Sequence, residues 1–108
     1  MKLIASSETE IIGKWLISQD RAVADETCQR IADLTKNYLV ELGRDSSGWD
    51  TLYRDPNDGR FWELIYPQGE LHGGGPPQLR CLSVDDAKRK YGNAVGEFYE
   101  DDRRGHHA

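Results

Sequence analysis

Residues 48–66 read GWDTLYRDPNDGRFWELIY, and this stretch predicts a β-hairpin. Apolar and polar residues alternate on both sides of a central run of turn-forming residues, which is the pattern of two paired strands. In that run, Pro56 presets φ for a type I turn, Asp55 can accept a hydrogen bond from the backbone ahead of it, and Gly59 suits a positive φ. We therefore expect two antiparallel strands joined by a turn at residues 55–59.

The segment before the hairpin predicts an amphipathic helix over residues 25–42. Its acidic start, at Asp25 and Glu26, suits the positive end of a helix dipole, and Gly43 is a natural left-handed stop. One apolar stripe recurs at steps of three and four residues, which is the period of a helix face. Its members are Cys28, Ile31, Leu34, Tyr38 and Leu42. We expect this stripe to pack against the sheet that contains the hairpin.

Shorter elements complete the prediction on either side. Residues 11–18 are rich in β-branched and aromatic side chains and predict a strand, in which Gly13 marks a bulge or a close approach of backbone. Residues 79–82 predict a further strand, and Ser83 caps a helix over residues 84–91. The expected fold class is α+β, with a small, mainly antiparallel sheet, one long amphipathic helix packed on a face, and a short second helix near the C-terminus.

The chain has 108 residues and a mass of 12.3 kDa, which suits one compact domain. We expect a single α+β domain over residues 1–92 and a polar, acidic C-terminal extension over residues 93–108. The two cysteines cannot build a disulfide scaffold, and the sequence predicts neither a signal peptide nor a membrane span. We therefore expect a cytoplasmic protein that does not bind membranes.

Acidic residues outnumber basic ones by 19 to 14, which gives a formal net charge of −5 at pH 7. A surface of that sign repels the phosphates of nucleic acids and favours a basic protein as partner. Two of the three histidines, His106 and His107, lie at the end of the extension. Two histidines on a tail seldom form a specific metal site, so we expect neither a metal nor another cofactor.

A glycine-rich loop, HGGGPP at residues 72–77, follows the hairpin. Its first four residues match the oxyanion-hole loop of lipases and esterases, but the chain has no nucleophile elbow and is too short for that fold. Three interpretations remain: backbone N–H groups that bind an anion, a tight structural loop packed against the hairpin, or a loop that contacts a partner. We favour the structural loop.

Carboxylates are concentrated in or beside the hairpin. They are Asp50, Asp55, Asp58, Glu63 and Glu70. A pair of carboxylates can perform acid–base catalysis, but the spacing places no second carboxylate opposite Glu63. The alternatives are a solvated face or an ion pair between Glu63 and Arg54 or Arg60 on the hairpin. We therefore expect no catalytic site here.

Five short motifs follow one another in the middle of the chain. They are SGW at 47–49, LYRDP at 52–56, DGRFWEL at 58–64, YPQ at 66–68 and ELHGGGPP at 70–77. In this order they resemble immunity protein family 27, small bacterial proteins that protect cells from polymorphic toxins. The resemblance covers roughly residues 8–92 and does not extend to the tail. Motif residues with an expected structural role are Gly48, Trp49, Gly59, Trp62, Gly73, Gly74, Gly75, Pro76 and Pro77.

The resemblance implies a non-enzymatic inhibitor that binds one cognate secreted toxin in the cytoplasm. We expect it to cover the active site of a basic, nuclease-type toxin domain, with affinity from a few hot spots. The candidate partner-binding residues are Asp50, Asp55, Asp58, Glu63, Glu70 and His72. If the shared motifs are structural instead, the interface lies elsewhere, because immunity surfaces must differ to discriminate between toxins. The alternative surfaces are the helix face with Glu26, Arg30, Asp33 and Lys36, and the acidic tail Glu97–Asp102.

Two other functions stay open at this point. The first is an adaptor that binds another protein without neutralising it. The second is a small enzyme that reverses a toxin's modification and uses Glu63 and His72 for acid–base work. An enzyme would protect in catalytic amounts, whereas a sequestering inhibitor must be present in stoichiometric amounts.

Overall fold

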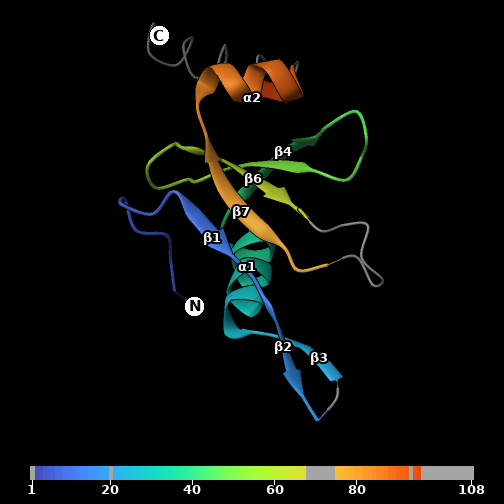
Figure 1. Cartoon of the computed structure of the whole chain (residues 1–108). Helices are drawn as coiled ribbons and strands as arrows, with labels where there is room; N and C mark the ends of the chain where they lie inside the picture. Colours follow the sequence, from blue (N-terminus) through green and yellow to red (C-terminus); the bar gives the residue numbers. More distant parts are fainter. Residues whose placement is uncertain (1, 20, 68–74, 93, 96–108) are drawn as a thin grey trace, which may run out of the picture.

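A computed structural model describes residues 2–19, 21–67, 75–92 and 94–95 of the chain (Figure 1). The elements are β1 (Glu10–Ile12), β2 (Trp15–Ser18), β3 (Arg21–Ala24), α1 (Glu26–Asn37), β4 (Val40–Arg44), β5 (Thr51–Arg54), β6 (Phe61–Ile65), β7 (Gln78–Leu82) and α2 (Val84–Tyr91). Five strands form an antiparallel sheet in the order β1-β7-β6-β5-β4, and β2 and β3 form a separate two-stranded sheet. The predicted α+β fold class is confirmed.

The predicted hairpin is confirmed as strands β5 and β6, next to each other within the five-stranded sheet. In its register, Tyr53 lies opposite Trp62. The turn is also as predicted: the Asp55 carboxylate accepts a hydrogen bond of 2.8 Å from the Asn57 backbone N–H, and Gly59 has a φ of +79°. A residue with a side chain would be strained at that φ. Local turn chemistry therefore sets the register of these two strands.

The two faces of the sheet are covered by different helices (Figure 1). Strand residues point alternately to the two faces, so Trp62 lies on the α1 side and Glu63 on the α2 side. The α1 side buries the larger apolar cluster, made of Ile4, Ile11, Ile31, Leu34, Leu39, Tyr53, Trp62 and Leu79. The α2 side buries a smaller one, made of Leu52, Phe61, Ala87, Tyr91 and Val95. The sheet thus separates two small cores.

Helix α1 is shorter than predicted, because it ends at Asn37 and does not continue to residue 42. Its start is as predicted, since the Asp25 carboxylate caps the helix by accepting a hydrogen bond of 2.9 Å from the Cys28 N–H. Beyond the helix the chain becomes β4, whose backbone pairs with β5, so Leu42 belongs to a strand. Gly43 is therefore not a helix stop but a strand residue beside a register shift. Pairing with a distant strand overrides the helical period here.

The strand predicted over residues 11–18 is divided at Gly13 into β1 and β2, which belong to different sheets. The expected close approach is confirmed: a Cβ on Gly13 would lie 2.7 Å from Cys28 Sγ and 2.8 Å from the Pro77 carbonyl oxygen. The Gly13 N–H donates a 2.9 Å hydrogen bond to that same oxygen. After β2 the chain returns as β3, a strand that was not predicted, and this second hairpin projects from the body (Figure 1).

Candidate functional site

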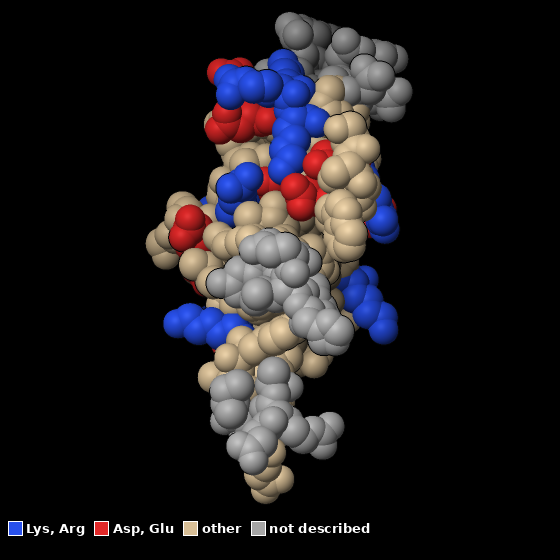
Figure 2. Space-filling model, turned by 45° about the vertical axis from the view of Figure 1, so that its right-hand side comes forward, with Lys and Arg blue, Asp and Glu red and all other residues tan. Residues whose placement is uncertain are grey.

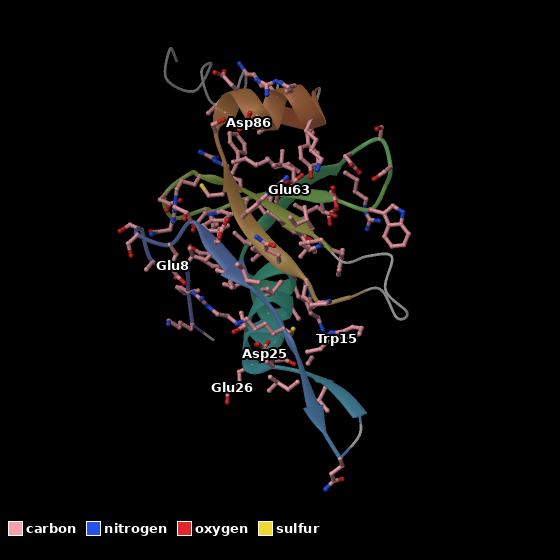
Figure 3. The ribbon with its side chains drawn as sticks, in the orientation of Figure 1. Glu8, Trp15, Asp25, Glu26, Glu63 and Asp86 are labelled. Atoms are coloured by element: carbon pink, nitrogen blue, oxygen red, sulfur yellow. The ribbon has the colours of Figure 1, made fainter. Side chains whose placement is uncertain are left out.

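Glu63 is a fully buried carboxylate in the middle of β6, on the side of the sheet that faces α2 (Figure 3). Its Oε1 accepts a 2.7 Å hydrogen bond from Arg80 Nε, and its Oε2 accepts one of 2.7 Å from the Tyr91 hydroxyl. Lys90 Nζ lies 2.5 Å from Oε2 and also donates a 2.7 Å hydrogen bond to Asp50 Oδ2. We call these five side chains, which come from β6, β7, α2 and the β4–β5 turn, the Glu63 cluster.

The charges of the Glu63 cluster stabilise one another. Burial alone would raise the pKa of Glu63, but hydrogen bonds from Lys90, Tyr91 and Arg80 outweigh it, and the net pKa is lowered. Burial, together with the hydrogen bond to Glu63, raises the pKa of Tyr91. Figure 2 shows the same mixture on the surface, with basic and acidic side chains interleaved near α2. Glu63 is therefore an ionised group with both oxygens engaged, which is the arrangement of a structural ion pair.

Neither of the two alternatives for Glu63, a solvated face or an ion pair with Arg54 or Arg60, describes it, because the side chain is buried and its ion-pair partners are Arg80 and Lys90. The register of β6 places Glu63 opposite Leu52 on one neighbouring strand and opposite Arg80 on the other. Sequence analysis missed Arg80 because it lies on β7, on the far side of the glycine-rich loop. Aligning 79–82 beside the return strand of the hairpin would have found it. No local signal indicates Lys90, which reaches Glu63 from α2.

The predicted partner-binding carboxylates lie in different environments. Asp55 has no exposed surface and accepts a 2.6 Å hydrogen bond from the Tyr38 hydroxyl, which raises the pKa of Tyr38 to about 12. Asp58 forms a 2.7 Å ion pair with Arg60 in the turn. Asp50 joins Glu63 through Lys90, so these two predicted residues do come together. The predicted residues that lie outside the described part of the chain are Glu70, His72, Gly73, Gly74 and the acidic tail Glu97–Asp102.

Asp55 and Glu63 are both too deeply buried to contact a partner in the structure as it stands. A side chain with no exposed surface in the free protein cannot contact a partner unless the sheet rearranges. Both carboxylates instead hold elements of this fold together, Asp55 through Tyr38 and Glu63 through its cluster. Direct contact with a partner stays a prediction for Asp50 and Asp58, whose side chains are 22% and 26% exposed.

The alternative surface on α1 is partly occupied by the N-terminal segment. Arg30 donates two hydrogen bonds to the Glu8 carboxylate, of 2.9 and 2.8 Å, and a further one of 3.1 Å to the Lys2 carbonyl. The hydrogen bonds from Arg30 lower the pKa of Glu8 to about 2. Asp33 accepts a 3.0 Å hydrogen bond from Gln29, one turn away on the same helix. Arg30 thus connects α1 to the N-terminal segment through hydrogen bonds to Lys2 and Glu8. The other two residues of this face, Glu26 and Lys36, are exposed.

The motif residues divide into buried and exposed ones. Trp62 is fully buried in the α1-side core, whereas the side chain of Trp49 is 70% exposed. Gly48 and Gly75 both have a positive φ, of +79° and +68°. Pro76 and Pro77 line a hollow of about 520 Å³ together with the segment 12–15. Trp49 is therefore a large aromatic residue of the motif that does not pack in either core.

Two broader findings apply to the residues that the structure describes. No group of three or more His, Cys, Asp or Glu side chains among them is placed to hold a metal ion. Neither of their helices is long and apolar enough to span a membrane.

Comparison with known proteins gives one match. The family model described as Immunity protein 27 matches residues 17–83, which include the hairpin, the motif glycines and all of β7. The search of curated proteins and the search of solved structures each find no match.

Proposed function

This chain belongs to the immunity protein 27 family, and from that premise we propose that it neutralises a cognate toxin domain by binding it stoichiometrically and covering its active site. The family match is the observation that carries the proposal. An inhibitor of this kind works as a preformed surface, because rigidity reduces the entropy lost on binding.

The internal hydrogen bonds of this domain support such rigidity. The Glu63 cluster fastens α2 to the sheet, and Arg30 fastens the N-terminal segment to α1. Arg60 adds two hydrogen bonds to the backbone of that segment, of 2.6 and 3.0 Å. Each of these contacts joins residues far apart in the sequence, so that α2 is held to the sheet and the N-terminal segment is held to both α1 and the β5–β6 hairpin.

The net charge of −5 supports a basic toxin as the partner. Opposite net charges accelerate encounter through electrostatic steering and disfavour partners of the same sign. A nuclease whose cleft binds phosphates is one class of toxin with that charge. We accordingly propose a secreted, nuclease-type toxin as the partner, and the cytoplasm as the place where the two proteins meet.

A cell-protection experiment tests the proposal. Membership of the family implies that a cognate toxin is encoded in a neighbouring reading frame. The toxin domain from that reading frame is expressed at a fixed level, and the protein is expressed from a second promoter over a wide range of doses. We expect growth to recover only when the molar amount of the protein reaches that of the toxin. Protection at a small fraction of that amount would indicate an enzyme, and binding without protection would indicate an adaptor. A toxin from an unrelated family is the specificity control, against which no protection is expected.

A further inference from the structure

The turn between β4 and β5 lies at the upper right of Figure 1. Trp49 belongs to this turn and is exposed to solvent. At 70%, its exposed fraction is the highest among the exposed large apolar residues of the described chain. One exposed apolar residue needs no functional explanation, but a group of them with polar neighbours marks an interaction site. The question is therefore what surrounds Trp49 and how firmly it is held.

The turn holds Trp49 through a network of hydrogen bonds centred on Asp45. Asp45 Oδ1 accepts hydrogen bonds from Ser47 Oγ at 2.7 Å, from the Gly48 N–H at 3.1 Å and from the Asp50 N–H at 3.3 Å. The Trp49 N–H donates to Ser47 Oγ at 3.1 Å, and the Asp45 N–H donates to the Asp50 carbonyl at 3.0 Å. The backbone N–H groups of Gly48, Trp49 and Asp50 are thus all hydrogen-bonded within the turn.

Asp50 connects this turn to the rest of the fold, because its carboxylate binds Lys90 of the Glu63 cluster at 2.7 Å. Gly48 adopts the positive φ that lets the turn close, with no atom within 4 Å of a Cβ built on it. A large aromatic side chain on a preformed turn loses little conformational entropy when it binds. The exposure of Trp49 is therefore built into the turn.

A hollow of about 460 Å³ lies beside Trp49. Arg44 and Tyr66 line it, and Tyr53 and Leu64 of the sheet contribute to its lining as well. Tyr66 is 38% exposed, and Arg44 is also exposed. Tryptophan, tyrosine and arginine are the residue types most enriched at energetic hot spots of protein interfaces. Here all three line one hollow.

Resting on the proposed function, we infer that Arg44, Trp49 and Tyr66, which we call the Trp49 surface, anchor the toxin domain. Arg44 is the one charged residue among the described residues that line the hollow. A matching partner therefore offers an apolar pocket for the indole ring and a carboxylate for the guanidinium group. The net charge of −5 accelerates association with a basic partner, whereas the contacts of Trp49 slow dissociation of the complex.

Binding by matched variants tests the inference. The probe is the purified toxin domain encoded next to this protein, and the full chain is titrated as wild type, Trp49→Ala and Leu16→Ala. Leu16 is a suitable control because it is 54% exposed and lies on the projecting β2–β3 hairpin. We expect Trp49→Ala to weaken binding by roughly 100-fold, mainly through faster dissociation, and Leu16→Ala to change it by less than about 3-fold. Both variants should unfold at the same urea concentration as wild type.

A spectroscopic experiment gives a second readout. The chain contains three tryptophans, Trp15, Trp49 and Trp62, so 5-fluorotryptophan labelling yields three ¹⁹F signals. The signal that disappears in Trp49→Phe belongs to Trp49. We expect the toxin domain to shift this signal most and to leave that of the buried Trp62 in place.

The possible results separate the two proposals. If wild type binds the toxin domain and Trp49→Ala binds equally well, the Trp49 surface is not the anchor and the proposed function stands. If wild type does not bind, the proposed function itself fails. If wild type sediments as a dimer and Trp49→Ala as a monomer, the surface joins two copies of this chain, and the inference is overturned.

Discussion

Glu63 joins three parts of the fold through one carboxylate. It lies on β6 and binds Arg80 on β7 as well as Lys90 and Tyr91 on α2. A buried charge is tolerated only when its partners compensate for the lost hydration. Removing the charge therefore leaves Arg80 and Tyr91 without their carboxylate acceptor, whereas Lys90 keeps its ion pair with Asp50. Asp55 joins two parts of the fold in a similar way, because it accepts a hydrogen bond from the hydroxyl of Tyr38, the residue that caps the C-terminal end of α1.

We expect Glu63→Gln to lower the free energy of unfolding by about 1–3 kcal/mol at pH 7, because Arg80 and Tyr91 lose the charged acceptor of their hydrogen bonds. Because the pKa of Glu63 is lowered in the folded protein, its contribution is in place above the pKa of an ordinary glutamate. It is lost as the pH falls through the lowered pKa. Urea unfolding measures the change, and the exposed Glu41→Gln is the control, with a loss below about 0.5 kcal/mol. Equal losses in both variants would contradict a structural role for the cluster.

Glu8 gives a pH-dependent prediction of its own. Hydrogen bonds from Arg30 lower its pKa from 4.5 to about 2, which corresponds to at most about 3 kcal/mol. Partial exposure of the side chain reduces this to about 1–2 kcal/mol. We expect wild type to be more stable than Glu8→Gln by that amount above about pH 5, and the difference to vanish as the pH falls from 4.5 towards 2. Urea unfolding across this range measures it, and a constant difference would exclude the ion pair as its cause.

At the scale of elements, α2 depends on residues that follow it. Val95 is fully buried in the α2-side core, with Leu52, Phe61 and Tyr91 in the same cluster. Prediction places this residue in the C-terminal extension, yet it packs with the domain. The small core on this side of the sheet therefore extends at least to residue 95.

We expect Val95→Ala to lower the free energy of unfolding by about 2 kcal/mol, because it leaves a cavity in a small core. Val84→Ala is the matched control: the same substitution on α2, at a side chain that is 39% exposed. We expect it to cost less than about 0.5 kcal/mol. Thermal and urea unfolding of both variants measure the difference. A Val95→Ala loss as small as that of the control would mean that the end of the chain does not stabilise α2.

Elements with local signals were predictable, and those that depend on distant pairing were not. The hairpin turn at 55–59 and the second helix follow from residues within a few positions of one another. The end of α1 does not, because the apolar period continues to Leu42 while the backbone there pairs with β5. The division of the first strand depends on Gly13 meeting Pro77, 64 positions away. Helical and strand periods alone carry no such information.

In the candidate site, too, residues with a local signal were predictable and those contributed by distant elements were not. The carboxylates around Glu63 were evident from composition, but their cations were not, because Arg80 and Lys90 come from β7 and α2. Trp49 was expected among the structural residues, since alternation placed it on the strand. The strand begins only at Thr51, so Trp49 belongs to the turn and is exposed.

At the scale of the whole molecule, the protein is elongated, with extents of 59 × 29 × 20 Å. Helix α2 lies at one end and the β2–β3 hairpin at the other, with the five-stranded sheet between them (Figure 1). The turn that carries Trp49 is held to the α2 end through Asp50 and Lys90. In the proposed mechanism, the buried charges make the domain rigid, the net negative charge accelerates encounter with the toxin, and the Trp49 surface supplies the affinity.

A titration of purified toxin activity with the purified full chain distinguishes stoichiometric inhibition from every alternative. We expect residual activity to fall linearly with added protein and to reach zero at one molecule per toxin, and native mass spectrometry to show a one-to-one complex. Complete inhibition far below the equimolar ratio, or undiminished activity in excess protein, would contradict stoichiometric inhibition.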